Sequence, residues 1–378
     1  MDLEGEERKA PPFVVTHTSS SLLGDINQPW GYPAWIQQEE QEVLVEQRRQ
    51  GTSLLASNSW LSQVLSEASL SITPQQLQRR TTVESVSAQD VRLIACLGDS
   101  LLTGLCVTAH PDKWKNIALA ELPGLCCGSC LQWTISGEHR NNTCITGSAD
   151  GVVSVGKLFK AFSPDIAGLT RSKTPLFSRG AGFNFARTGS TIYNLDNQIA
   201  RCIDKLRRPG FMHLEGRWKL LFIWIGANDV FSTSRAAISR DFQHRLVCGL
   251  QKLKAVLSKT VVYVLTLPDL SQAVKSNLVP QKTILINQLL TNAVTDYDWN
   301  TDEFKVELLV MPSEAINVEE YQRFVSHIDG MHPNFLAQQL FAKFIWNNLW
   351  LDHDRRLRTF HETINAPWIK PDDSSVLK

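Results

Sequence analysis

Val91-Arg-Leu-Ile-Ala-Cys-Leu-Gly-Asp-Ser-Leu-Leu-Thr-Gly-Leu105 is the stretch around which the rest of the chain is organised. Its first half is a β-branched and aliphatic run typical of a buried strand, and it ends at Gly98-Asp99-Ser100, which suits a turn and a helix cap. Ser100 is therefore predicted to lie at a strand-to-helix junction, where free N–H groups can stabilise negative charge near its oxygen. Helix capping alone also explains this tripeptide, so a catalytic role depends on partners elsewhere.

Three further short blocks follow in order along the chain. They are Asn184–Gly189, Phe222–Asp229 and Asp329–Pro333. With Gly98–Leu101 they resemble the four sequence blocks of the GDSL or SGNH hydrolase family, which is named after its Ser, Gly, Asn and His. A single block such as Gly-x-Asn-Asp is a common loop, but four in order, each behind a strand-like or loop-like segment, are not expected by chance.

Strand-like and helix-like segments alternate after the first block. Ligand sites in a parallel sheet covered by helices form beyond the carboxyl ends of the strands, which is where all four blocks fall. The class predicted is α/β, and the resemblance implies an SGNH-hydrolase (flavodoxin-like) three-layer sandwich with a five-strand parallel sheet. The further strands are expected at Phe183–Ala186, Leu220–Ile225, Val261–Leu267 and Val306–Met311, and helices at Ile192–Leu206, Ala236–Leu257 and Gln281–Thr295.

Composition changes along the chain suggest four parts. We expect an irregular N-terminal arm over residues 1–35, a helical preface over 36–90, the catalytic domain over 91–352 and a polar, loosely ordered tail over 353–378. The apolar run Leu340–Leu351 has helical spacing. A membrane-surface helix would look similar, but a core helix is the more common origin of such a run.

The charge balance and the lack of long apolar stretches argue against a nucleic-acid-binding protein and against a membrane-spanning one. Lys+Arg and Asp+Glu number 38 each, so no net charge attracts nucleic acid, and we expect no nucleic-acid partner. The charged N-terminus lacks the apolar core of a secretory signal, and no stretch reaches membrane-spanning length. The chain as written is expected to be soluble and cytoplasmic, but its localisation stays open, because members of the family that it resembles are secreted or membrane-anchored.

The cluster Cys126-Cys127-Gly-Ser-Cys130 is a candidate metal-binding or disulfide motif. Without a second pair of Cys or His residues, such a cluster is more often an ordinary loop. No metal and no cofactor are therefore predicted.

Segments between the blocks narrow the resemblance to the membrane-associated phospholipases B of animals. The likeness covers most of residues 90–350 and is carried by Trp133–Glu138, Val155–Gly168, Trp218–Asp229 and Phe344–Leu349. Two departures stand out: Leu105-Cys106-Val107 replaces an Ala-Gly-Asn-Gly-like turn, and Val230-Phe231-Ser232 replaces cysteines that usually follow the Gly-x-Asn-Asp block. Because loops shape the substrate pockets, these departures affect the expected substrate more than the expected chemistry.

Ser100, His332 and Asp329 fit the three roles of a hydrolytic triad. A hydroxyl needs a base to remove its proton as it attacks, and the base works best when a third group holds its ring. Asp329 lies three residues before His332, and the resemblance places both on one loop, with the carboxylate on one ring nitrogen and Ser100 on the other. A histidine taken alone would be interpreted as a surface or capping residue.

The resemblance also implies an oxyanion hole, which binds the negative oxygen formed during attack. Its donors would be the backbone N–H groups of Ser100 and Gly189 and the side-chain amide of Asn228, each contributing about 10²–10³-fold to the rate. Gly189 alone would be an ordinary turn glycine. Asp99 and Asp229 are expected to orient the neighbouring turns.

The predicted function is a serine ester hydrolase that removes fatty acyl chains from phospholipids and lysophospholipids through an acyl-enzyme on Ser100. A short-chain carboxylesterase of the same fold and a non-catalytic lipid-binding relative are the alternatives. The expected partners are a phospholipid or other acyl-ester substrate and a transient contact with a membrane surface, and the oligomeric state stays open. The loop-rich stretch Thr108–Gly182 could wall an apolar groove beside Ser100.

Overall fold

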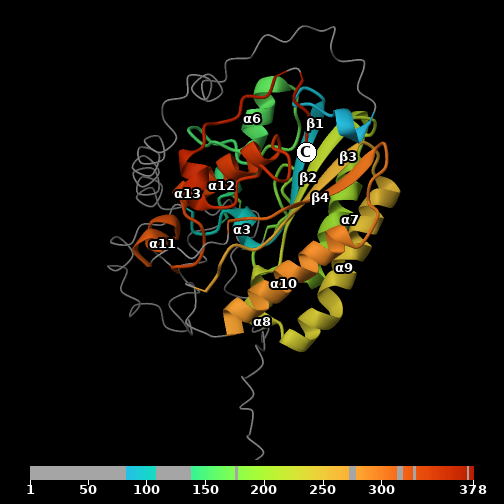
Figure 1. Ribbon diagram of the computed structural model, residues 1–378. Helices are drawn as coiled ribbons and strands as arrows, with labels where there is room; N and C mark the ends of the chain where they lie inside the picture. The colour runs from blue at the N-terminus through green and yellow to red at the C-terminus, as the bar shows by residue number, and fades with distance from the viewer. Residues whose placement is uncertain are drawn as a thin grey trace, which may run out of the picture. The chain divides into compact units, whose positions relative to one another are not determined.

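The computed structural model describes residues 82–107, 138–174, 178–271, 278–312, 318–326, 329–372 and 374–378 (Figure 1). All of them belong to the compact unit Glu40–Lys378. The expected N-terminal arm, nearly all of the helical preface, the cysteine cluster at 126–130 and residues 108–137 of the expected groove wall lie outside the described residues.

A parallel sheet forms the centre of this unit. Its strands β1 (Val91–Gly98), β2 (Trp218–Trp224), β3 (Thr260–Leu265) and β4 (Phe304–Leu309) pair in the order β1-β2-β3-β4. Every residue of β2 and β3 is buried, because a parallel strand covered on both faces needs a nearly continuous apolar sequence. The structure confirms the predicted α/β class with a parallel sheet.

The segment expected to form the fifth strand, Phe183–Ala186, is not a strand: Asn184 makes one isolated parallel bridge to Cys96 of β1 and one isolated antiparallel bridge to Ala181. The Cys96 N–H donates to the Phe183 carbonyl at 3.0 Å and the Phe185 N–H donates to the Cys96 carbonyl at 2.8 Å. Further back along β1, Leu93 bridges to Ala167 instead. Two short segments thus share this edge of β1, and the sheet has four strands within the described ranges.

Helices cover both faces of the sheet and complete three layers, as predicted (Figure 1). Helix α9 packs with α7 and α10 on one face, and α12 packs with α6 and α13 on the other. The bounds are α7 (Leu195–Leu206), α9 (Arg235–Val256) and α10 (Leu278–Thr295) on the first face, and α6 (Val155–Phe162), α12 (Phe335–Asn348) and α13 (Phe360–Asn365) on the second. Shorter helices are α3 (Ser100–Thr103), α8 (Ala227–Ser232) and α11 (Val318–Phe324), with 3-10 turns η2 (Val83–Ser85), η4 (Arg140–Asn142), η5 (Ile192–Asn194) and η6 (Met212–Leu214).

Helix α12 is buried along its whole length. The Trp346 ring packs edge-on against Phe159 of α6, with 5.0 Å between the ring centroids. The apolar run after His332 is therefore a core helix, as predicted. No helix in the described part of the chain is both long and apolar enough to cross a lipid bilayer.

The expectation of a loosely ordered tail is wrong. Trp368 and Leu377 are buried, the Trp346 indole donates to the Ile369 carbonyl at 2.7 Å, and the Leu377 N–H donates to the Val86 carbonyl at 2.8 Å. A few apolar side chains spaced along a polar sequence are enough to hold the tail against α12. The domain limits expected from the sequence stay predictions.

Candidate active site

The predicted nucleophile lies where β1 ends. An added Cβ at Gly98 would lie 1.9 Å from the Trp224 carbonyl oxygen, so only glycine allows β1 and β2 to approach this closely before the chain turns. The next residue, Asp99, caps α3 by accepting from the Leu101 N–H at 3.1 Å. Ser100 is therefore the first residue of a helix at the carboxyl edge of the sheet, as its sequence context predicts.

Ser100, His332 and Asp329 are joined by two hydrogen bonds. The Ser100 Oγ lies 2.7 Å from His332 Nε2, and His332 Nδ1 lies 2.5 Å from Asp329 Oδ2. The other Asp329 oxygen accepts from the backbone N–H groups of Met331 and His332, both at 3.0 Å. The structure thus brings together the three residues proposed from the sequence, although 232 positions separate Ser100 from His332.

The protonation of this chain of bonds follows from the carboxylate. Burial raises the pKa of Asp329, but the hydrogen bonds from His332 and from the backbone outweigh it and hold that pKa below its ordinary value. An ionised Asp329 can only accept, so the proton between the two groups is on His332 Nδ1. In a neutral imidazole with this tautomer, His332 Nε2 carries no proton and accepts from the Ser100 hydroxyl, which is the arrangement that a general base requires.

Asp99 and Asp229 bridge the turns that surround the triad. Asp99 also accepts from the Ala227 N–H at 3.2 Å, which ties the turn after β2 to the turn after β1. Asp229 accepts from the Ile192 N–H at 2.9 Å and ties α8 to η5. Burial raises the pKa of Asp99 to about 7 and that of Asp229 to about 6.

The three predicted oxyanion donors come from neighbouring segments. The Asn228 amide donates to the Ser190 carbonyl at 3.0 Å, which places it beside the Gly189 segment. Gly189 has φ +78°, and an added Cβ there would find no heavy atom within 4 Å, so this backbone borders open space. The adjacent Thr188 hydroxyl lies 2.9 Å from that of Thr103 in α3, the helix that begins at Ser100.

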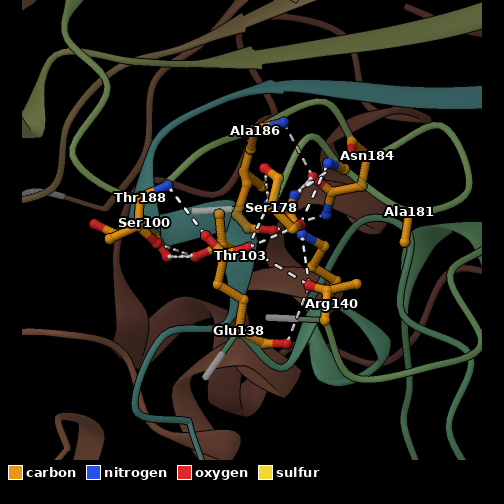
Figure 2. A network of polar contacts seen from close by, with 12 residues as sticks. Ser100, Thr103, Glu138, Arg140, Ser178, Ala181, Asn184, Ala186 and Thr188 are labelled. Carbon is orange, nitrogen blue, oxygen red and sulfur yellow. Dashed lines mark hydrogen bonds and ion pairs between the residues drawn. The ribbon is translucent and has the colours of Figure 1, made fainter. Parts of the chain in front are cut away.

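Figure 2 shows a buried network next to these residues that the sequence analysis missed. Glu138 and Arg140 form an ion pair of 2.7 Å with both side chains fully buried, and the Glu138 carboxylate accepts from the Thr188 N–H at 3.3 Å. Charged side chains are usually exposed, so their sequence gives no sign of burial. The available signal was that Glu138 ends the block Trp133–Glu138, which carries part of the resemblance; Arg140 lies two residues beyond that block.

One group of potential metal ligands stands out among the described residues. The ligand atoms of Cys106, Asp329 and His332 all lie within 4.8 Å of one another. Two of the three residues are already joined at 2.5 Å by the hydrogen bond of the triad, which is too short to admit an ion between them. This donor set fits an orienting carboxylate better than a metal site.

An apolar cavity of about 60 Å³ is lined in part by residues that adjoin the triad in the sequence. Its walls include Leu101, which follows Ser100, and Met331 and Pro333, which flank His332. Phe324 and Phe341 contribute aromatic surface. The walls of this apolar cavity thus include direct sequence neighbours of Ser100 and His332.

The chain is similar to a known lipase family and to known phospholipases. The family described as GDSL-like lipase/acylhydrolase matches residues 94–345. The chain is 25% identical over 194 residues to the membrane-associated phospholipase B1 of Homo sapiens and 26% identical over 150 residues to that of Mus musculus, which is 50% and 40% of this chain. These matches span only 12% and 9% of the relatives' own lengths.

A solved structure resembles the chain more distantly. A protein described as a GDSL-like lipase from Parabacteroides merdae is 15% identical, with a TM-score of 0.38, over 70% of this chain and 95% of that one.

Proposed function

The chain belongs to the GDSL-like lipase/acylhydrolase family, and from this premise we propose that it is a serine ester hydrolase with Ser100 as its nucleophile. The observation that carries the proposal is the hydrogen-bonded sequence of Ser100, His332 and Asp329, at 2.7 Å and 2.5 Å. It supplies the nucleophile, the base and the orienting carboxylate that acyl transfer needs.

The reaction begins when the Ser100 Oγ attacks the ester carbonyl carbon and its proton passes to His332 Nε2. The resulting imidazolium is stabilised by Asp329 and gives the same proton to the departing alcohol oxygen as the carbon–oxygen bond breaks. Water then attacks the acyl-enzyme, passes its proton to His332, and releases the acid as Ser100 regains a proton. The negative carbonyl oxygen of each tetrahedral step is bound by the N–H groups of Ser100 and Gly189 and by the Asn228 amide.

We propose a fatty acyl ester as the substrate, with phospholipids and lysophospholipids as the first class to test. The phospholipase B1 relatives and the apolar cavity beside Leu101 and Met331 support this choice. A lipid substrate also entails transient contact with a membrane surface. The small cavity volume, about 60 Å³, instead favours a short acyl group, so a short-chain carboxylesterase is the second candidate.

A chain-length series separates the two candidates. If an apolar surface binds the acyl chain, each added methylene contributes about 0.8 kcal/mol, or roughly fourfold in kcat/KM, until the surface is filled. Fatty acid released from p-nitrophenyl esters and from lysophosphatidylcholines would be quantified, with the Ser100→Ala variant as the blank. A maximum at acetate or butyrate with no release from lysophosphatidylcholine would leave only the carboxylesterase.

A non-catalytic relative of the family is tested separately with a fluorophosphonate probe, which labels activated serines. Wild-type protein should be labelled and Ser100→Ala should not. Unlabelled but folded wild-type protein, beside a labelled control esterase, would contradict the proposed function.

A further inference from the structure

Glu138 and Arg140 form an ion pair that solvent does not reach, with both side chains 0% exposed and 2.7 Å between Glu138 Oε2 and Arg140 Nη2. Removing two charges from water is costly, and replacing a buried ion pair by apolar side chains is often neutral or stabilising. A contribution to stability therefore explains this ion pair poorly, and its position in the structure suggests a different role. The bonds that it makes lead to both sides of the active site (Figure 2).

The Glu138 side of the pair leads to the loop of the oxyanion hole. Its Oε1 accepts from the Thr188 N–H at 3.3 Å, and Thr188 directly precedes Gly189. The Glu138 backbone is itself fixed, because it exchanges two hydrogen bonds with Thr174, at 3.1 and 2.9 Å. The carboxylate is thus an anchored acceptor that sets the position of the peptide groups on either side of Thr188.

The Arg140 side of the pair leads to the helix of the nucleophile. Arg140 Nη1 donates to Asn184 Oδ1 at 2.9 Å, and the Asn184 amide donates to the Leu102 carbonyl at 2.8 Å. Leu102 lies in α3, two residues after Ser100. The same Asn184 oxygen accepts from the Ala186 N–H at 3.2 Å, so Arg140 fixes both α3 and the start of the Gly189 segment.

We propose that Glu138 is a positioning residue that directs the Gly189 N–H toward the carbonyl oxygen of the substrate, and that Arg140 holds Glu138 in place. This inference rests on the proposed function, because it takes Gly189 as an oxyanion donor. Neither side chain touches the substrate. Their effect comes from geometry, since a misplacement of about 1 Å can cost about 100-fold in rate.

The test replaces the pair by apolar side chains of similar length, Glu138→Met with Arg140→Met. We expect a folded protein whose kcat falls about tenfold or more while KM is nearly unchanged, because the hole acts mainly on the transition state. A trifluoromethyl ketone, which forms a tetrahedral oxyanion on the serine, should bind more weakly by the same factor. Hydrogen exchange at residues 186–191 should become faster, because the Thr188 N–H loses its acceptor.

A matched control is Glu307→Gln, which breaks another ion pair, that of Glu307 with Lys305 at 2.9 Å. It should leave kcat, ketone binding and exchange at 186–191 unchanged. If the double variant fails to fold, Glu138→Gln tests the ion pair alone: it keeps the shape and an oxygen that can accept from the Thr188 N–H, but removes the charge that pairs with Arg140, so kcat and ketone binding are then the measurements and both should still fall. Unchanged exchange at 186–191 in the double variant, or a fall in kcat/KM that comes from KM alone in either variant, would overturn the proposal.

The exchange measurement needs no turnover. If wild-type protein hydrolyses no ester, the proposed function fails, and faster exchange in the variant would still support the positioning role of the pair. Unchanged exchange in an active enzyme would remove that role and leave the hydrolase intact.

Discussion

Replacing Asp329 with asparagine isolates what this carboxylate does for His332. Its two oxygens have separate tasks: Oδ1 accepts from the backbone N–H groups of Met331 and His332, and Oδ2 accepts from the imidazole. Asparagine has only one oxygen. Because two fixed backbone donors meet at one position, the amide oxygen should take that position and the amide NH₂ should face His332 Nδ1.

This arrangement forces the imidazole into the wrong tautomer. An NH₂ group can only donate, so His332 Nδ1 must become the acceptor and its proton moves to Nε2. The Ser100 hydroxyl, 2.7 Å from Nε2, then faces a donor and loses its base. The corresponding change in serine hydrolase triads lowers kcat about 10⁴-fold, or about 5 kcal/mol of transition-state stabilisation. KM should change little, because Asp329 does not belong to the proposed binding surface.

The assay is steady-state hydrolysis of a p-nitrophenyl ester, together with the rate of fluorophosphonate labelling, which should fall in parallel. Asp372→Asn is the matched control, because Asp372 also accepts from a backbone N–H, that of Ser374 at 2.9 Å, but lies in the tail outside the site. Retention of more than a tenth of the wild-type kcat by folded Asp329→Asn would refute the tautomer argument and reduce Asp329 to a loop-stabilising residue.

Three further predictions concern other parts of the described structure. Asn228→Ala should lower kcat by about 10²-fold at nearly constant KM, whereas Ser232→Ala, on the same helix, should change neither; an effect on KM alone would contradict the oxyanion role. Burial raises the pKa of Asp99 to about 7 in the folded state, whereas an aspartate in an unfolded chain has a pKa of about 3.9. Between these two values the folded state retains a proton that the unfolded state loses. The contribution of Asp99 to stability therefore falls as pH rises from about 4 to about 7. Asp99→Asn should flatten that slope in thermal unfolding, and an unchanged slope would assign it to other groups. Trp368→Ala should cost about 3–5 kcal/mol in urea unfolding if the tail is part of the core, and a loss below about 1 kcal/mol would contradict its packing.

The sheet was largely predictable because its strands carry their own signal. A parallel strand buried on both faces is nearly continuously apolar, and β2 and β3 are short runs of that kind apart from Lys219 and Thr260 near their starts. The segment Phe183–Ala186 is also apolar apart from Asn184, but the edge of β1 beside it is also occupied by Ala167. An apolar run becomes a strand only if enough of the edge of a neighbouring strand is unpaired. The local sequence of the run does not show whether another segment already occupies that edge.

The C-terminal tail is more ordered than its sequence predicts. Its composition beyond His353 is polar, and the few apolar side chains lie too far apart in sequence to show a period. They bury because α12 has apolar or hydrogen-bonding surface on all sides: Trp346 and Asn347 both meet tail backbone, at Ile369 and Pro367. Order in such a segment is decided by the surface it meets, so composition alone underestimates it.

The parts of the site differ in how directly their sequence determines them. Asp329 and His332 are close in sequence, and the carboxylate also accepts from the backbone of that same loop, so Asp-x-x-His nearly specifies the pair. Ser100 reaches His332 only because β1 delivers it to the sheet edge that α12 borders. The Glu138–Arg140 pair belongs to neither case. Charged residues are expected to be exposed, and only the folded chain shows that this pair is buried and bonded to Thr188 on one side and to Asn184 on the other. Positioning residues of this kind are identified from the structure, through the hydrogen bonds that connect them to the segments carrying the proposed reacting groups.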